Sequence, residues 1–217
     1  METEATPPSM RETAYRTLRR LLVLQKIPEG ERLREPQWAE RLGVNRTALR
    51  EAFARLEAEG LIEHGERTGY FVPVLKREDI SEIFFVRTVL ECAAIELICT
   101  APKNALTASK SLHGLCDEFE QFAGSHYSLG TSEADRRFHE CLMNAGRNKR
   151  LEMLYNRAPL PLIHSKIVSD RQWTDQTNLV AAEHRGIADA IGHADAKLAK
   201  RRLKAHLGAR HVLAITA

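Results

Sequence analysis

The sequence predicts a mainly α-helical protein, in which an N-terminal helix-turn-helix with a small β wing precedes an antiparallel bundle of six helices. Three observations lead to this prediction. Apolar residues recur at helical spacing along most of the 217 residues. Aromatic residues make up 6% of the chain and charged residues 28%, a balance that suits helices better than sheets. Strand-like segments around a glycine-containing turn occur between residues 60 and 73, and no convincing strand follows them.

The chain begins with a polar, Pro-containing stretch, residues 1 to 9, that we expect to be a disordered tail. An amphipathic helix follows over residues 10 to 25. Pro28 and Gly30 end it, because neither residue continues a helix. Residues 31 to 33 can then form a short strand that joins the wing.

A helix over residues 35 to 42, closed by Gly43, and a second helix over 44 to 59 form the predicted helix-turn-helix. In the second helix, apolar residues such as Leu49 and Phe53 recur at helical spacing, so one face can enter a core. Its N-terminal end carries the polar side chains Asn45, Arg46, Thr47 and Arg50. Backbone N–H groups and the positive end of the helix dipole meet phosphate at such an end, and Arg forks can bind phosphate or guanine edges. Taken alone, arginines at this spacing are more typical of a solvated helix face. Together with the preceding helix, the glycine corner and the following two-stranded wing, however, they follow the plan of a winged helix-turn-helix, so this helix is predicted to contact double-stranded DNA.

The net charge is only +3 at pH 7, so a DNA site must be a local patch rather than a generally basic surface. We expect the patch to consist of Arg34, Arg46, Arg50, Arg67 and their neighbours. In the wing, His64 beside Gly65 can approach a phosphate or the minor groove, or it can be a solvated turn residue and nothing more.

The four cysteines show neither a C-x-x-C pair nor zinc-ribbon spacing, which favours reduced core residues.

No apolar run reaches membrane-spanning length, and the N-terminus lacks the apolar region of a signal peptide. These features predict a cytoplasmic protein. A chain of 217 residues can bury a sizeable core in one or two domains.

We expect residues 10 to 73 to form a DNA-binding domain, 74 to 78 a linker, and 79 to 217 an all-helical domain. Asp79 is expected to be the N-cap of the first bundle helix. The six predicted helices run over about 79 to 100, 105 to 124, 132 to 145, 148 to 169, 175 to 192 and 195 to 214. Pro159 and Pro161 should kink the fourth. Bundle interiors commonly hold ligand and metal sites.

Asp135 and His139 lie four residues apart, so a carboxylate and an imidazole share one face of a helix. Taken alone, this pair is more typical of a surface helix or a satisfied core histidine. His184 and His206 fall on later helices, each flanked by apolar residues, so both border the bundle interior, where a lone histidine would need a partner. Three imidazoles and one carboxylate suit Zn, Ni, Fe or Mn and leave one or two coordination positions open.

Arg87 lies among apolar residues of the first bundle helix, with Glu91 four residues later. One interpretation is an intrahelical ion pair at the surface, which contributes little to stability. The other is a partly buried guanidinium that faces a cavity and clamps the carboxylate of an organic effector.

The chain resembles GntR-type transcription regulators of the fatty-acid-responsive, FadR-like subfamily, which have a winged helix and a C-terminal FCD ligand-binding domain. The N-terminal resemblance rests on residues 32–35, 42–52, Leu56, 59–62 and 69–72. The C-terminal resemblance rests on Asp135, Phe138, His139, Asn148, His184, Ile187, Ala190, Ile191, His206 and Leu207. This second set is similar to the metal-binding form of the FCD domain, and six bundle helices are closer to the vanillate-regulator branch than to FadR itself.

The resemblance implies a homodimer, a palindromic operator, and a change in DNA contact when a small carboxylic acid enters the bundle. Carried over by position, Arg46, Thr47, Arg50, His64 and Gly65 would contact DNA, and Asp135, His139, His184 and His206 would bind the metal. The chain would then be a ligand-responsive transcription regulator, and more specifically a repressor.

Two rival functions stay open on the residues alone. A His/Asp metal site could activate water in an enzyme, although the sequence lacks H-E-x-x-H, an adjacent His-Asp pair, and a Ser or Cys nucleophile with a local base. The bundle could also be free of ligand, in an architectural DNA-binding dimer. The sequence favours a regulator over an enzyme.

Overall fold

The computed structural model describes residues 9–23, 26–65, 69–156 and 170–216. The chain divides into two compact units, Met1–Val74 and Leu75–Ala217. Most of the expected disordered tail, the wing residue Arg67 and the expected kink at Pro159 and Pro161 lie outside the described residues.

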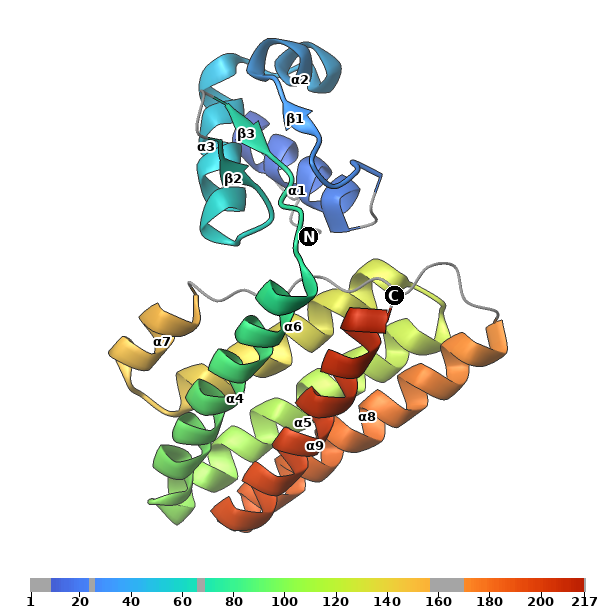
Figure 1. Ribbon diagram of the computed structural model, residues 1–217. Coiled ribbons are helices and arrows are strands. Elements are labelled where there is room, and N and C mark those ends of the chain that lie inside the picture. The colour runs from blue at the N-terminus through green and yellow to red at the C-terminus, as the bar shows by residue number, and fades with distance from the viewer. Residues whose placement is uncertain (1–8, 24–25, 66–68, 157–169, 217) are drawn as a thin grey trace, which may run out of the picture. The chain divides into compact units, whose positions relative to one another are not determined.

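Within the described residues, the first unit consists of three helices and a three-stranded antiparallel sheet (Figure 1). Its elements are α1 (Met10–Val23), β1 (Arg32–Leu33), α2 (Glu35–Leu42), α3 (Arg46–Ala58), β2 (Glu63–His64) and β3 (Tyr70–Phe71). The central strand is β3, in which Tyr70 pairs with Leu33 of β1 and with His64 of β2. The predicted strand before the helix-turn-helix thus joins the wing.

The core of the first unit lies between α1, α3 and the wing. Leu18 of α1 and Leu49 and Phe53 of α3 are fully buried there. The Phe53 ring also lies 4.9 Å, between centroids, from the ring of Tyr70 in β3. Because the apolar face of α3 is inside, the polar residues of its first turn are outside.

The tight turn between α2 and α3 is fixed by Gly43 and Asn45. Gly43 ends α2 with φ 63°, in the left-handed region that glycine adopts without a steric penalty. Asn45 is the N-cap of α3, where its side-chain Oδ1 accepts a hydrogen bond of 2.8 Å from the backbone N–H of Ala48. The predicted glycine corner is therefore present.

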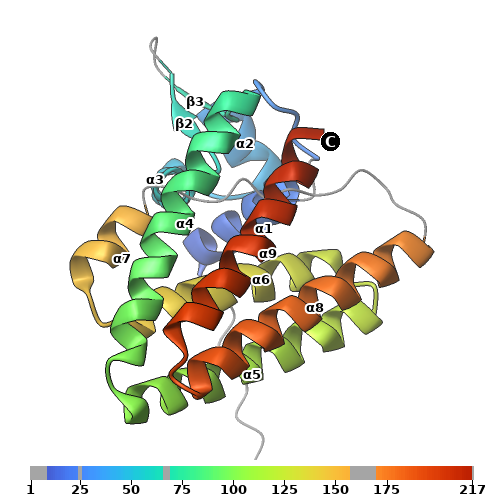
Figure 2. The same cartoon turned by 60° about the horizontal axis from the view of Figure 1, so that its bottom comes forward.

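The second unit contains six helices in the part of the chain that the structure describes: α4 (Arg77–Cys99), α5 (Pro102–Gly124), α6 (Ser128–Ala145), α7 (Lys149–Tyr155), α8 (Asp170–Gly192) and α9 (Ala196–Thr216). Figures 1 and 2 show α4 beside α9 and α5 beside α8, and α6 packs against both α4 and α5. The mainly helical fold with a small wing and a helical bundle is confirmed. The fourth predicted helix is described only as far as Tyr155.

Several helix starts differ from the sequence prediction; α5, for example, begins at Pro102 rather than at residue 105. α4 begins at Arg77, and Lys76 rather than Asp79 is its N-cap. Asp79 lies at the third helical position, and its carboxylate accepts a hydrogen bond of 2.9 Å from the backbone N–H of Lys76, so it stabilises the helix start from inside the first turn. α6 begins at Ser128 rather than at residue 132, and Gly130 in its first turn lies close beside the rings of Phe122 and Tyr127. α8 begins at residue 170, in the gap between the fourth and fifth predicted helices.

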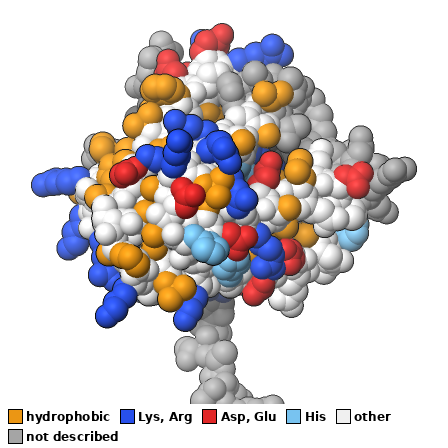
Figure 3. Space-filling model, turned by 90° about the horizontal axis from the view of Figure 1, so that it is seen from below, with side chains coloured by type: hydrophobic (Ala, Val, Ile, Leu, Met, Phe, Trp, Pro, Cys, Tyr) orange, Lys and Arg blue, Asp and Glu red, His pale blue; other side chains and the backbone are white. Residues whose placement is uncertain are grey.

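All four cysteines are free, as their spacing indicated. Burial raises the pKa of the Cys116 thiol to about 12, which makes this thiol unreactive. Of the described helices, none is long and apolar enough to span a bilayer. The end of the bundle drawn at the bottom of Figure 1 carries basic and acidic side chains interspersed with hydrophobic ones, as a solvated surface does (Figure 3).

Candidate metal centre and nucleic-acid interface

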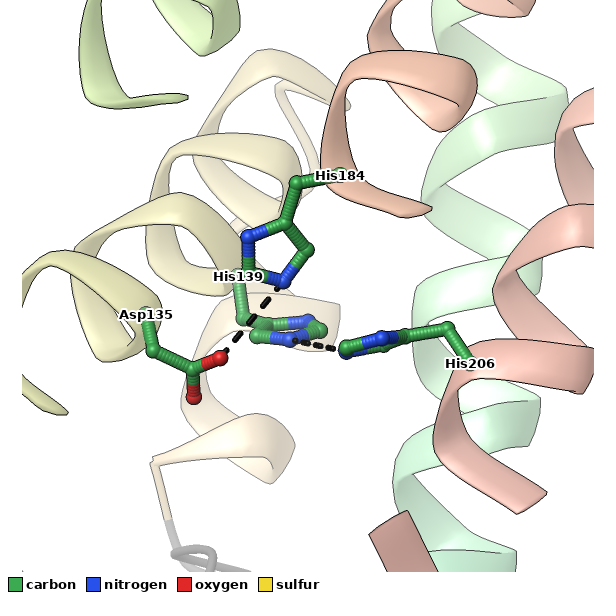
Figure 4. Close-up of side chains that lie close together, drawn as sticks. All are labelled: Asp135, His139, His184 and His206. Atoms are coloured by element: carbon green, nitrogen blue, oxygen red, sulfur yellow. Dashed lines mark hydrogen bonds and ion pairs between the residues drawn. The ribbon is translucent and has the colours of Figure 1, made fainter. Parts of the chain in front are cut away.

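Four side chains predicted from the sequence as metal ligands converge inside the bundle (Figure 4). Asp135 and His139 lie on α6, one turn apart, His184 lies on α8 and His206 on α9. Each offers one ligand atom, and these atoms lie within 4.8 Å of one another. The exposed fractions of the three histidines are 0%, 1% and 1%. We call these four side chains the Asp/His cluster.

The apolar neighbours of the histidines in the sequence explain why the rings face inward. His184 shares its helix face with Ile187 and Ile191, and His206 with Leu203 and Leu207, and these four neighbours are core residues. The ring of Phe138 stacks on that of His184, with centroids 4.1 Å apart and an interplanar angle of 9°. The helical spacing of the sequence therefore places both histidines correctly.

Several polar atoms of the Asp/His cluster lack hydrogen-bond partners that would account for their burial. Asp135 Oδ1 and both ring nitrogens of His184 are buried and make no hydrogen bond within the described residues. The Asp135 Oδ1 to His184 Nε2 distance is 3.5 Å, and the His139 Nε2 to His206 Nε2 distance is 3.3 Å. Buried polar atoms without partners are rare in proteins and often indicate a bound ion. Two ligand atoms that share one ion at 2.0–2.2 Å lie about 3 to 4.4 Å apart, depending on the coordination geometry, so both distances suit a shared ion.

The pKa shifts of Asp135, His184 and His206 favour the protonation states that bind a metal. Burial lowers the pKa of His184 well below its ordinary value, and burial also lowers the pKa of His206. Burial opposes ionisation of Asp135, but the charge of Arg210 helps to outweigh it, and the pKa of this carboxyl is below its ordinary value. Neutral imidazoles and an ionised carboxylate are the forms that coordinate cations.

Two glutamates contact the outer nitrogens of the cluster, and neither was predicted from the sequence to take part in binding metal. Glu91 Oε2 lies 2.6 Å from His139 Nδ1, and Glu183 Oε2 lies 2.8 Å from His206 Nδ1. Glu91 is fully buried, whereas the side chain of Glu183 is 25% exposed. The burial of Glu91 could have been predicted from the sequence, because Glu91 falls on the same helical stripe as the buried residues Phe84, Ala94 and Ile98.

Arg87 also belongs to the buried stripe of α4, with 3% of its surface exposed. Its Nη2 lies 2.9 Å from Glu91 Oε1, and it donates a further hydrogen bond to the hydroxyl of Tyr155 on α7. The guanidinium also lies 4.4 Å from the centre of the Tyr155 ring. The interpretation as a surface ion pair is therefore wrong, because both partners are in the core.

A pocket of ≈ 250 Å³ adjoins Tyr155 between α6 and α7. It is lined by Glu140, Met143, Asn144, Glu152, Tyr155 and Asn156. Two carboxylates in its wall make it unsuited to an anion, so this pocket is not a good site for a carboxylate effector.

The second candidate site is the N-terminal end of α3. Arg46, Thr47 and Arg50 are exposed there. Arg50 Nε forms an ion pair of 2.8 Å with Glu35 Oε2, and the preceding residue, Arg34, is exposed near the same end. The side-chain oxygen of Asn45 is occupied as the helix cap.

The wing residues predicted to contact DNA lie at the end of the β2–β3 hairpin. His64 is exposed, and its ring centroid is 4.6 Å from that of Tyr70. The backbone N–H of Gly65 donates a hydrogen bond of 3.0 Å to the carbonyl oxygen of Gly69. A Cβ atom at Gly65 would collide with the Phe71 ring, so this position requires glycine.

Comparison with known proteins assigns both units. Residues 10–72 match the bacterial regulatory proteins of the gntR family, and residues 82–209 match the FCD domain. The HTH-type transcriptional regulator YdhC of Bacillus subtilis (strain 168) is 29% identical over 196 residues, which is 88% of this chain and 85% of that protein. The probable D-xylose utilization operon transcriptional repressor of Paenarthrobacter nicotinovorans is 28% identical over 205 residues, or 92% and 88% of the two chains.

Solved structures show the same fold. A putative GntR transcriptional regulator from Rhodococcus sp. RHA1 has a TM-score of 0.70 at 24% identity, over 97% of this chain and 99% of that chain. E. coli McbR/YncC has a TM-score of 0.70 at 17% identity, over 96% and 98%. The sequence relatives are named as transcription regulators and not as enzymes. The chain belongs to the gntR family of bacterial regulatory proteins, and its second unit is an FCD domain.

Proposed function

We propose that this regulator is a repressor whose bundle binds one divalent transition metal and, next to it, a small organic carboxylate that acts as effector. The observation that carries the proposal is the buried Asp/His cluster, in which Asp135 Oδ1 and the ring nitrogens of His184 have no hydrogen-bond partner. Zinc, nickel, iron and manganese all accept this set of nitrogen and oxygen ligands. Because four protein ligands leave one or two positions open on a five- or six-coordinate ion, a carboxylate oxygen could complete the shell.

Arg87 is the residue that we predicted would hold the charge of the effector. In this structure its guanidinium is engaged by Glu91 and Tyr155. A direct contact with an effector would therefore require the guanidinium to exchange the Tyr155 hydroxyl for the carboxylate of the effector. This exchange would move a contact between α4 and α7, and so would offer a route from ligand binding to a change in the bundle.

For DNA, we propose that the first turn of α3 enters the major groove of a palindromic operator while the wing contacts the backbone. Exposed Arg46 and Arg50, together with the helix N-terminus, supply donors for phosphates and guanine edges. The proposed contact residues are Arg34, Asn45, Arg46, Thr47, Arg50, His64 and Gly65. The helix cap occupies the side-chain oxygen of Asn45, so its amide NH₂ is the group left to donate.

A palindromic operator requires two copies of the protein, and we propose that the bundle forms the dimer. The outer face of α4 exposes three large apolar side chains, with Phe85 70%, Val86 40% and Val89 53% exposed. The neighbouring helix α9 exposes Val212 to 56%. Two adjacent helices of 23 and 21 residues present a face of roughly 33 by 20 Å. This is about 650 Å², close to the roughly 800 Å² per partner of a standard interface.

Phe85→Asp should convert the full-length dimer into a monomer, because a charge would be buried without a partner at the centre of the interface. The affinity for the operator should fall when the dimer is lost. Light scattering measures the mass in solution. The matched control is Leu106→Asp, which introduces the same charge at a 52% exposed leucine on α5. A Phe85→Asp protein that stays dimeric would move the interface away from this face of α4.

The sensor function is tested by titrating operator DNA with metal-loaded and metal-stripped protein in the presence of acetate, malate, citrate or benzoate. We expect at least one acid to lower the operator affinity of the loaded protein and to leave the stripped protein unaffected. If none of these acids changes the affinity of the loaded protein, the architectural dimer without an effector becomes the better account.

A further inference from the structure

We propose that Glu91 and Glu183 are positioning residues of the metal centre, each fixing the tautomer and direction of one ligand histidine, and that Arg87 is the counter-charge that keeps Glu91 in place. This inference rests on the proposed binding of a metal by the Asp/His cluster. It assigns Arg87 a role that acts through Glu91, in addition to the proposed contact with the effector.

The hydrogen bonds at the two outer nitrogens determine where the ring protons lie. A carboxylate oxygen only accepts, so His139 Nδ1 must donate to Glu91 and His206 Nδ1 must donate to Glu183. In each neutral ring the lone pair is then on Nε2. These are the two atoms that face each other at 3.3 Å. Two lone pairs at this distance repel each other, and a cation between them removes the repulsion. The glutamates therefore hold the histidines in an arrangement that suits a bound cation.

The two glutamates differ in what surrounds them. Glu183 is 25% exposed and can be solvated, whereas Glu91 is fully buried and needs a counter-charge. Arg87 supplies this charge. Its Nε and Nη2 lie 3.1 and 2.9 Å from Glu91 Oε1, while the other oxygen, Oε2, contacts His139. Glu91 thus joins Arg87 and the ligand histidine through separate oxygens. Tyr155 holds the far side of the guanidinium.

The third histidine has no such carboxylate. His184 Nδ1 makes no hydrogen bond within the described residues, and its ring is held instead by stacking on Phe138 and by an edge contact to Phe119, with ring centroids 5.7 Å apart. The three rings are thus fixed in different ways. Removing a glutamate should loosen one ring and leave the other two in place.

The test measures the binding of Co²⁺ and Zn²⁺ to full-length protein that has been stripped with a chelator. Glu91→Gln and Glu183→Gln should each lower metal affinity by about 10- to 100-fold, the usual loss when a partner of a ligand histidine is changed. The visible spectrum of bound Co²⁺ should shift as well, because it reports ligand geometry rather than fold stability. The matched control is Glu120→Gln, which removes a surface carboxylate paired with Arg185 and should change neither quantity.

A second pair of variants separates positioning from a loss of folding. Glu91→Gln leaves the charge of Arg87 buried without its partner, so the double variant Arg87→Met/Glu91→Gln is measured beside it. Arg87→Met alone should also weaken metal binding, whereas a guanidinium that only clamps the effector would leave metal affinity unchanged. Wild-type affinity and an unshifted Co²⁺ spectrum in Glu183→Gln and in the double variant would refute the positioning role. A wild-type protein that binds no Co²⁺ or Zn²⁺ would instead refute the metal centre itself, and this inference with it.

Discussion

His184→Ala is expected to reduce the metal content of the purified protein from about one ion per chain to almost none. The proposed site has four protein ligands, and the loss of one weakens the hold on the ion enough to release it during purification. Loss of the ion should also lower stability, because a ligand present at a thousand times its Kd stabilises the folded state by about 4 kcal/mol. Elemental analysis after dialysis without chelator measures the first effect, and thermal unfolding the second.

The control for this experiment is His193→Ala. His193 is exposed, and its Nδ1 lies 2.8 Å from the backbone carbonyl oxygen of Asp189. The control protein should retain its metal and its unfolding temperature. Undiminished metal in a folded His184→Ala protein would show that the ion, if there is one, is held elsewhere.

Arg46→Ala and Arg50→Ala are each expected to weaken operator binding by about 1–3 kcal/mol, the loss found when a good base or phosphate contact is removed. Both side chains are exposed at the N-terminal end of α3. Arg50 is ion-paired with Glu35, but its side chain remains 67% exposed, so its other guanidinium nitrogens can reach DNA. Fluorescence anisotropy with an operator selected from random duplexes, at a fixed salt concentration, measures the effect.

The matched control for the arginine variants is Arg137→Ala. Arg137 is an exposed arginine that is ion-paired with a glutamate, Glu118, as Arg50 is, but it lies in the bundle. Operator affinity should not change in this variant. The salt dependence provides a second measure, because each lost phosphate contact should reduce the slope by about one. An Arg46 or Arg50 variant with full affinity at the same salt would place that residue away from the DNA.

The fold was predictable where local chemistry decides it. Gly43 and Asn45 end one helix and begin the next by hydrogen bonds within their own turn, so the sequence alone locates the corner. The start of α4 was misjudged because Lys76 lacks the side-chain chemistry of an ordinary cap. The start of α6 was predicted four residues too late, because the glycine at position 130 has a low helix propensity and made its first turn read as a loop.

In the candidate site, likewise, the four cluster residues could be predicted from local spacing, whereas their contacts with distant partners could not. Asp135 and His139 were paired by their four-residue spacing, and His184 and His206 were placed by their apolar neighbours. The contact between His139 and Glu91 joins residues 48 positions apart, and that between Arg87 and Tyr155 joins residues 68 apart. A single sequence gives no direct signal for such pairs.

The central claim, that the bundle of this regulator holds a divalent metal, is tested most directly by native mass spectrometry of the full-length protein as purified. The account predicts a dimer whose mass exceeds that of two chains by two divalent ions, and by a small acid where one is retained. Gentle unfolding in acid should release the ions, because the ligand histidines then become protonated. A protein that shows only the mass of the bare chains, even after incubation with Zn²⁺, Ni²⁺, Fe²⁺ or Mn²⁺, would contradict the claim.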